Sequence, residues 1–316
     1  MKGTRFLTAF FLGLVLLMAV GCQRGKQKKQ HDLDLALVLK TLNNPYFIDL
    51  QKGAEETASE RGVSLIVQAA EREVDVEKQM QIIENLIERN VSAIIVSPSG
   101  SREIIPAILK ANERQIPVLV IDTQVDMATL EEAGGKIATF IGSDNFEGGR
   151  IAGRFIVNLL GGKGDVAILE GIPGHETGDQ RLSGFHDVID KEDGIRIVAS
   201  QTANWERDQG FNVFQNILKS CRNIDALFCC NDMMALGAIE AIAAEGKGND
   251  LIVIGFDAIK DGREAIRKGT MTGSIAQHPY EMGKLAVENA VKQLSGEEIP
   301  DYIPVTIELI TRESLE

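Results

Sequence analysis

The sequence lacks the side-chain patterns on which most catalytic and metal sites are built. Its four histidines, His31, His175, His186 and His278, show none of the spacings that metal ligands take. No Ser-His-Asp set and no phosphate-binding P-loop occurs, and the nearest glycine cluster, residues 161–164, follows an expected helix rather than the first strand. We therefore expect no metal, no cofactor and no enzymatic activity.

Excess positive charge is missing as well. The chain carries a formal net charge of −13, whereas a nucleic-acid-binding surface needs a basic stripe. There is also no helix-turn-helix pattern, so we expect no nucleic-acid partner. Cysteine is scarce. Cys229 and Cys230 lie in an apolar run and are predicted to be small buried residues, and a disulfide between one of them and Cys221 is the alternative.

A long apolar run occurs only at the start of the chain. Residues 6–20 are apolar, follow a cationic start and are too few to span a bilayer comfortably, so residues 1–21 are predicted to be a signal peptide. The stretch from Ala19 to Cys22 resembles a bacterial lipobox, although Ala19 stands where leucine is usual. Cys22 is thus the predicted lipidation site, with an ordinary cleaved signal as the alternative. Residues 22–31 are polar and basic, as expected of a tether.

Strand-like and helix-like stretches alternate along the rest of the chain, which is long enough for two lobes. Such alternation predicts an α/β fold with parallel sheets. The first helix is expected over residues 49–60, and a later one over 147–160. The expected strands are residues 33–39, 63–69, 93–96, 118–121, 139–141, 166–169, 195–200, 226–230, 251–255 and 271–276.

Hydrogen-bonding and aromatic side chains recur where these strands end. In parallel sheets that edge is where ligands bind, and planar polar groups with aromatic faces suit a small ring bearing paired hydroxyls. Taken singly, some of these positions could have a purely structural role, since Asn231 could cap a helix and Asp122 could form a turn. The candidate ligand-binding residues are Lys40, Asn44, Tyr46, Phe47, Asp122, Arg181, Trp205, Asn231, Phe256, Asp257 and Gln277.

Five motifs are specific enough to indicate a family. They are Thr-Leu-Asn-Asn-Pro at 41–45, Trp205 with Asp-Gln-Gly-Phe-Asn at 208–212, Asn-Asp-Met-Met-Ala-Leu-Gly at 231–237, Gly-Phe-Asp at 255–257 and Ser-Ile-Ala-Gln at 274–277. With these motifs the chain resembles, from Leu33 to Thr311, the periplasmic sugar-binding proteins of bacterial ABC importers, of the ribose- and allose-binding type.

The resemblance implies a periplasmic binding protein type 1 fold, in which two Rossmann-like lobes are joined by a three-crossing hinge and close on a sugar. Lobe 1 would comprise residues 32–143 and 278–306, and lobe 2 residues 144–277 and 307–316. It also implies roles for the candidate residues. Tyr46, Phe47 and Trp205 would sandwich the sugar and Phe256 would line the pocket. Hydrogen bonds to the sugar would come from Asn44, Asp122, Arg181, Asn231, Asp257 and Gln277.

Two positions depart from the ribose-binding pattern. Ribose binders have serine where this chain has Lys40 and arginine where it has Thr123, whereas allose binders share the lysine but carry an acidic residue at the second position. The expected ligand is therefore an allose- or psicose-like hexose, with ribose next.

The resemblance further implies an exported monomer, in the periplasm or at the cell surface, that touches the membrane only through a lipid anchor and delivers its sugar to the permease of an ABC importer. A sensor that docks to a chemoreceptor is the alternative. A carbohydrate-active enzyme using Asp122 and Asp257 is less favoured, because sugar-binding sites also use carboxylates as plain acceptors.

Overall fold

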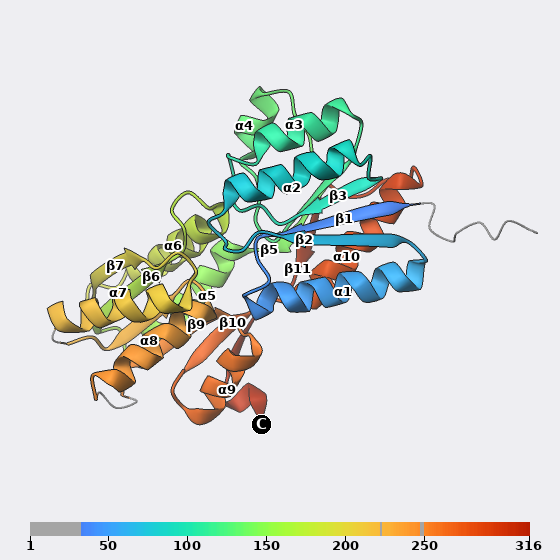
Figure 1. The fold of residues 1–316 in the computed structure, drawn as a ribbon. Coiled ribbons are helices and arrows are strands. Elements are labelled where there is room, and N and C mark those ends of the chain that lie inside the picture. The colour runs from blue at the N-terminus through green and yellow to red at the C-terminus, as the bar shows by residue number, and fades with distance from the viewer. Residues whose placement is uncertain (1–32, 222, 247–249) are drawn as a thin grey trace, which may run out of the picture. The chain divides into compact units, whose positions relative to one another are not determined.

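The computed structural model describes residues 33–221, 223–246 and 250–316. The predicted signal peptide, the lipidation site at Cys22 and the tether over residues 22–31 lie outside these residues. Within them, the chain forms two six-stranded sheets with helices on both faces (Figure 1). We call each sheet with its covering helices a lobe.

The first lobe is built on a sheet with the order β11-β5-β4-β3-β1-β2, in which every neighbouring pair is parallel. Helices α1 and α10 pack together on one face and α2 and α3 cover the other (Figure 1). The strands are β1 (Asp34–Leu39), β2 (Ser64–Ala69), β3 (Ala93–Val96), β4 (Val118–Ile121), β5 (Thr139–Ser143) and β11 (Tyr302–Val305). The helices are α1 (Pro45–Arg61), α2 (Val76–Glu88), α3 (Ile105–Glu113), α4 (Met127–Glu132) and α10 (Pro279–Leu294).

The second lobe is built on a sheet with the order β12-β10-β9-β8-β6-β7, parallel except where β12 runs against β10. Helices α5 and α6 pack as one pair, and α7 and α8 as another. The strands are β6 (Gly164–Glu170), β7 (Ile195–Thr202), β8 (Ala226–Cys229), β9 (Ile252–Asp257), β10 (Gly273–Ala276) and β12 (Glu308–Thr311). The helices are α5 (Asn145–Leu160), α6 (Glu176–Ile189), α7 (Arg207–Ser220), α8 (Asp232–Ala244) and α9 (Lys260–Lys268), with a final 3-10 turn, η1 (Glu313–Leu315).

The chain passes from one sheet to the other three times. It leaves the first sheet after β5, returns after β10 to form α10 and β11, and leaves again to add β12 to the second sheet. This arrangement confirms the predicted α/β fold of two parallel-sheet lobes joined by three crossings.

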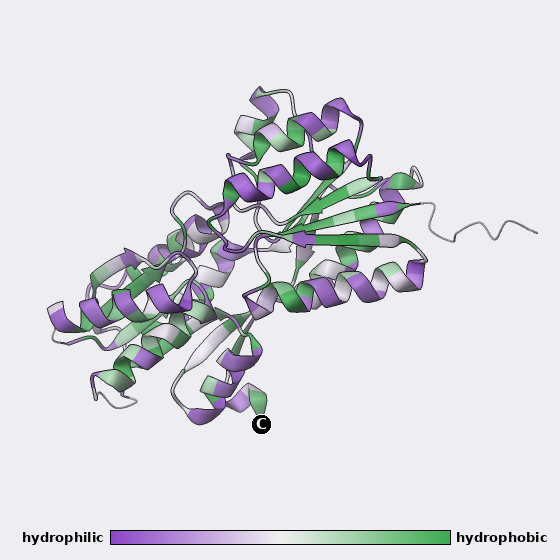
Figure 2. Cartoon of the chain, in the orientation of Figure 1, coloured by the Kyte–Doolittle hydropathy of each residue, from purple (hydrophilic) through white to green (hydrophobic). Residues whose placement is uncertain are grey.

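The central strands form the cores of the two lobes. Strands β3, β4 and β8 are apolar along their whole length and fully buried, as expected when helices cover both faces of a parallel sheet. Figure 2 shows the apolar colour of β3. Cys229 and Cys230 are buried free thiols, as predicted, and Cys221 is also free. In the described part of the chain, no helix has the length and apolarity to cross a bilayer.

The predicted start of the first helix was wrong. The helix begins at Pro45 rather than at residue 49, because the Asn44 side chain accepts a hydrogen bond from the Tyr46 amide and proline fits the first helical position. Tyr46 and Phe47 therefore lie on the first turn of α1. Helix α5 likewise begins at Asn145, two residues earlier than predicted, after the Asp144 cap.

Candidate functional site

The predicted residues gather around one cavity between the two lobes. The empty space within it, including space open to solvent, is about 270 Å³, so the cavity has room for no more than a small molecule. Lys40, Asn44, Tyr46, Phe47 and Asp122 line it from the first lobe, and Arg181, Trp205, Asn231 and Asp257 from the second. Phe256 and Gln277 do not line it but contact residues that do.

Lys40 follows β1 and is 3 % exposed. Its ammonium group donates to the Thr123 hydroxyl at 2.6 Å and lies 3.0 Å from an Asp122 carboxylate oxygen. Asp122 also accepts a hydrogen bond from the Ser97 hydroxyl at 2.8 Å. Lys40 is therefore not a solvated lysine at a strand end but a buried cation paired with a carboxylate in the cavity wall.

Glu73 lines the cavity but was not among the predicted residues. It lies in the loop after β2, is 5 % exposed, accepts a hydrogen bond from the Asn44 amide at 3.1 Å and lies 4.0 Å from the Lys40 ammonium group. Burial raises the pKa of its carboxyl to about 7, against the attraction of Lys40. Near neutral pH this side chain can thus either donate or accept a hydrogen bond.

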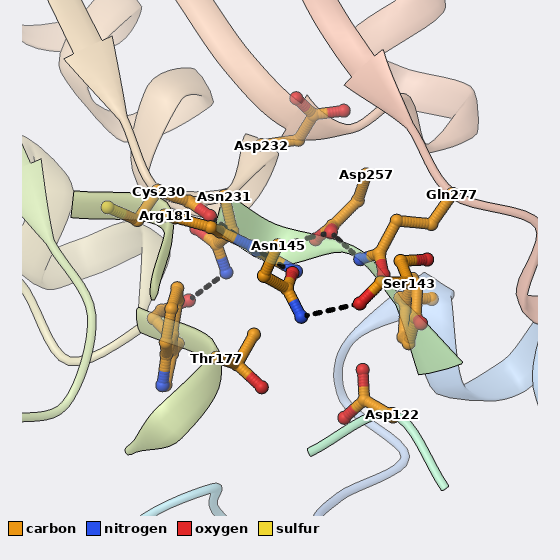
Figure 3. A network of polar contacts seen from close by, with 12 residues as sticks. Asp122, Ser143, Asn145, Thr177, Arg181, Cys230, Asn231, Asp232, Asp257 and Gln277 are labelled. Atoms are coloured by element: carbon orange, nitrogen blue, oxygen red, sulfur yellow. Dashed lines mark hydrogen bonds and ion pairs between the residues drawn. The ribbon is translucent and has the colours of Figure 1, made fainter. Parts of the chain in front are cut away.

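Arg181 organises the wall contributed by the second lobe. Its guanidinium group donates to the Asn145 side chain at 2.9 Å and to the Cys230 backbone carbonyl at 2.6 Å (Figure 3). It lies 3.6 Å from an Asp257 carboxylate oxygen and 3.7 Å from the centre of the Phe256 ring. Phe256 is thus a platform beneath Arg181, and Asn145, at the first crossing between the sheets, fixes the guanidinium plane.

Asp257 and Gln277 form a second hydrogen-bonded pair. The Gln277 amide donates to the Asp257 carboxylate at 2.8 Å (Figure 3). The Gln277 side-chain oxygen is buried with no hydrogen-bond partner in the described residues. Since buried polar groups are rarely left without partners, this oxygen is an acceptor that a hydroxyl group could satisfy.

Two carboxyl groups of the cavity have opposite pKa shifts. Burial tends to raise the pKa of Asp122, but Lys40, the Ser97 hydroxyl and Arg181 together hold it below its ordinary value. Burial raises the pKa of Asp257 to about 6 although Arg181 and Gln277 lower it. The Tyr46 phenol has a raised pKa, chiefly through burial, and is neutral. The wall therefore offers both acceptors and donors for hydroxyl groups.

Three aromatic rings give the cavity its flat surfaces. Tyr46 and Phe47 meet edge to face, with ring centres 5.2 Å apart, and the sole tryptophan, Trp205, lies on the side of the second lobe. Gly171 lies directly against the Trp205 ring, because a Cβ atom added there would be 2.0 Å from it. Only glycine at this position lets the indole lie so close to the β6–α6 loop.

Asn231 caps a helix and also lies in the cavity wall. Its side-chain oxygen accepts from the Met234 amide and caps α8, and its amide group donates to the Trp205 backbone carbonyl at 3.0 Å. It also lines the cavity. The neighbouring Asp232 is fully buried, accepts bonds from the Ser274 hydroxyl and the Ile259 amide, and is not part of the cavity wall.

Backbone strain is concentrated at this cavity. Seven non-glycine residues in the described part of the chain have positive φ, and five of them are cavity residues or their direct neighbours. They are Asp122 (63°), Asn204 (50°), Trp205 (67°), Asp257 (100°) and Ala258 (47°). Such conformations cost free energy and cluster at functional sites. The strand ends are therefore shaped to aim these side chains.

Several residues at the cavity were not predicted. Glu73 follows β2 just as the predicted residues follow other strands, so the strand-end argument would have found it if applied to that loop. Thr177 lines the cavity from the first turn of α6, and His175 and Asn145 contact cavity residues. No spacing in the sequence marks these three. Among the described residues, no group of three or more His, Cys, Asp or Glu side chains is arranged to hold a metal ion.

Comparison with known proteins identifies relatives along most of the chain. The family model described as "periplasmic binding protein domain" matches residues 35–298. The ribose import binding protein of Bacillus subtilis (strain 168) is 38% identical over 281 residues, covering 89% of this chain and 88% of the relative. The D-allose-binding periplasmic protein of Escherichia coli (strain K12) is 36% identical over 269 residues, covering 84% of this chain and 86% of the relative.

A solved structure has the same fold. The crystal structure of an ABC transporter periplasmic solute binding protein from Actinobacillus succinogenes 130z, with bound D-allose, superimposes with a TM-score of 0.85. The two chains are 41% identical, and the match covers 89% of this chain and 98% of that one.

Proposed function

The chain belongs to the periplasmic binding protein family, among the sugar-binding proteins of ABC importers, and from this membership we propose that it captures one monosaccharide between its lobes and delivers it to an ABC permease. The observation that carries the proposal is the cavity itself. It is small, and it has aromatic flat surfaces and a wall of paired carboxylate, ammonium, guanidinium and amide groups. These are the groups that bind a sugar's hydroxyls and its apolar face.

The preferred sugar is an allose- or psicose-like hexose, with ribose next. The relatives named for ribose and allose support this choice. The charged pair of Lys40 and Glu73 also supports it, because a hexose has one more hydroxyl group than a pentose to satisfy these side chains. All eleven candidate residues have a part in this proposal, with Phe256 acting through Arg181 and Gln277 acting through Asp257.

Transport is favoured over sensing, since one relative is named as an import binding protein and the solved structure as an ABC transporter solute binding protein. A chemoreceptor or signalling partner that recognises the closed form is the second candidate, and the cavity serves both roles equally. We propose a monomer whose lobes correspond to residues 32–143 with 278–306 and residues 144–277 with 307–316. The pairing of β11 with β5 and of β12 with β10 supports these boundaries.

We propose that the protein is not an enzyme. The raised pKa values of Glu73 and Asp257 do suit general acids of glycoside hydrolysis. However, a glycosidase must hold both sides of a glycosidic bond, and this cavity has room for no more than a small molecule. Asp122, moreover, is paired with Lys40 and hydrogen-bonded to Ser97, which suits a fixed acceptor.

We propose that the mature protein is exported and anchored through a lipid on Cys22. Export agrees with the family, whose members act in the periplasm, and the lipobox-like stretch before Cys22 supports the anchor.

The experiment that tests the function is a thermal-shift screen of the purified protein against monosaccharides, including D-allose, D-psicose and D-ribose. We expect at least one hexose to raise Tm more than ribose does, because a ligand that binds only the folded state stabilises it. If no monosaccharide raises Tm, the proposed function is wrong.

A further inference from the structure

We propose that the first turn of α6 is a direct latch between the lobes, and that His175 at its start is a positioning residue that holds the Trp205 indole against the first lobe. By the latch we mean His175, Glu176 and Thr177 with their hydrogen bonds to the first lobe. The effect on sugar release rests on the proposed function, whereas the contact between the lobes does not.

Three consecutive residues of the second lobe make the latch. The His175 Nε2 atom lies 2.5 Å from the backbone carbonyl of Ser99 in the loop after β3. The Glu176 amide donates to the Ser101 hydroxyl at 3.1 Å. The last bond runs between side chains, from the Thr177 hydroxyl to the hydroxyl of Thr123 after β4, at 2.9 Å.

Two of the three bonds of the latch are buried and the Glu176 bond is partly buried, whereas an ion pair that joins the same two sides is more exposed. His175, Ser99, Ser101, Thr177 and Thr123 are each at most 4 % exposed. The ion pair between Arg72 and Glu206 also links the lobes, at 3.5 Å, but its side chains are 52 % and 27 % exposed. Exposed ion pairs contribute little, whereas breaking a buried hydrogen bond leaves a buried group without a partner. The latch is therefore the stronger direct link.

The His175 ring makes one bond on each of its nitrogens. A carbonyl oxygen only accepts, so Nε2 carries the proton and donates to Ser99. An indole N–H only donates, so the Nδ1 atom accepts from Trp205, at 3.4 Å. The neutral ring with its proton on Nε2 satisfies both partners, and burial, with Lys40 nearby and Asp122 opposing, lowers the pKa of His175 to about 4. The His175 side chain thus links the Trp205 ring of the second lobe to the loop after β3 in the first lobe.

Helix capping does not explain His175. It occupies the N-cap position of α6, where Ser, Thr, Asp or Asn usually satisfies a helical amide, but its side chain makes no capping hydrogen bond. The amide of Glu176, the first helical residue, has no acceptor within the helix and uses Ser101 of the other lobe instead. Both features direct the start of α6 towards the first lobe. Protection of the Glu176 amide from hydrogen exchange with solvent therefore reports on its contact with Ser101.

Matched variants of His175 separate its two bonds. His175→Gln places an amide near the position of Nε2 and keeps a donor for Ser99, whereas His175→Asn reaches only the position of Nδ1 and keeps an acceptor for Trp205. His175→Ala removes both. His186→Ala is the control, because His186 lies on the same helix and pairs only with the exposed Asp190 among the described residues.

The test measures hydrogen exchange of the Glu176 amide with and without D-allose, and the D-allose dissociation rate followed by Trp205 fluorescence. We expect His175→Ala to lower the protection of the Glu176 amide and to speed D-allose dissociation by about 3- to 10-fold, because the buried hydrogen bond to Ser99 across the lobes is lost. His175→Gln should keep most of the wild-type protection of the Glu176 amide and most of the slow dissociation. His175→Asn should keep only the wild-type emission of Trp205. His186→Ala should match the wild type in all three measurements.

An unprotected Glu176 amide in the wild-type protein, or equal protection and dissociation in wild type and His175→Ala, would overturn the latch. So would equal losses in the Gln, Asn and Ala variants, since these would indicate a purely structural histidine. If the wild-type protein binds no monosaccharide at all, the proposed function fails, while the exchange comparison between wild type and His175→Ala still decides the latch.

Discussion

At the scale of single residues, the charged groups of the cavity wall are paired with one another. Lys40 pairs with Asp122 at 3.0 Å and lies 4.0 Å from Glu73, and Arg181 lies 3.6 Å from Asp257. Burying a charge without a partner is costly, so these pairs allow the walls to be dry and still present hydrogen-bonding groups. A neutral polyol suits such a surface better than an ion does.

Replacing Lys40 tests its part in specificity. We expect Lys40→Ser to weaken binding of the preferred hexose by about 1–3 kcal/mol, because a buried charge-assisted donor is lost. The difference in binding free energy between this hexose and ribose should therefore become smaller. Calorimetry with D-allose and D-ribose on the wild type and the variant measures both. Lys52→Ser, at an exposed position on α1, is the control. Equal losses for the two sugars would show that Lys40 does not set specificity.

Glu73 gives the fold a measurable pH dependence. Its folded pKa, about 7, lies above the ordinary 4.5, so the folded protein binds its proton more tightly than the unfolded chain does. The contribution of Glu73 to stability is therefore highest below about pH 4.5, falls as pH rises to about 7, and stays low above it. Glu73→Gln imitates the protonated form and should escape this loss, which corresponds to about 3 kcal/mol of unfolding free energy.

Denaturant unfolding of the wild type and Glu73→Gln between pH 4.5 and 8 measures this effect. The unfolding free energy of the variant minus that of the wild type should increase as pH rises to about 7 and should be constant above that pH. Glu71→Gln, at an exposed position in the same loop, should show no such trend. A stability difference between Glu73→Gln and the wild type that does not change with pH would mean that the Glu73 pKa is ordinary in the folded protein.

At the scale of elements, the site is made of strand ends and the loops that support them. Residues after β1, β2, β4, β7 and β8, together with the end of β9, all reach the same cavity, as the carboxyl ends of parallel strands should. The β6–α6 loop has a further task, because Gly171 lies against the Trp205 ring and His175 binds its indole nitrogen. The position of the tryptophan thus depends on a loop that is distant in sequence.

Two glycines near Trp205 provide a graded test of that support. A Cβ atom at Gly171 would lie 2.0 Å from the ring, and one at Gly178 would lie 3.1 Å from it. Gly171→Ala should displace the indole, shift its emission and weaken D-allose binding by about tenfold or more, since overpacking costs about 1–3 kcal/mol. Gly178→Ala should have a much smaller effect. Similar fluorescence and affinity in both variants would contradict this packing.

The sequence predicts the parts of the site that follow a local rule. Asp122 and Asp257 end apolar runs, and the alternation of strands and helices places both at one edge. It does not reveal that Asn44 caps α1 and so moves the helix start to Pro45, because a cap depends on the geometry of one side chain. Nor does it reveal the contact between His175 and Ser99, which are 76 residues apart and meet only when the lobes do.

At the scale of the whole molecule, three crossings join two separately built sheets around one site. Each lobe has its own buried strands, and residues of both lobes form the walls of the cavity. Periplasmic binding proteins move by hinge closure around the ligand. In this chain the cavity walls, the latch and the ion pair between Arg72 and Glu206 supply contacts between the lobes.

The anchor proposed for the mature protein is tested in cells. Labelled palmitate should enter the wild-type protein, and Cys22→Ser should abolish the label and release the protein from the membrane fraction. Cys221→Ser is the control, because this cysteine belongs to the folded second lobe. A wild-type protein that takes up no palmitate would leave ordinary secretion as the correct interpretation of the signal sequence.

The central claim is that the protein binds one intact monosaccharide between its lobes. Calorimetric titration of the purified protein with D-allose, followed by chromatography of the recovered sugar, tests it most directly. We predict one sugar bound per chain, a Kd near or below the micromolar range, which corresponds to about 8 kcal/mol, and sugar recovered unchanged. The absence of binding heat with D-allose, D-psicose and D-ribose alike, or conversion of the sugar into a product, would contradict the account.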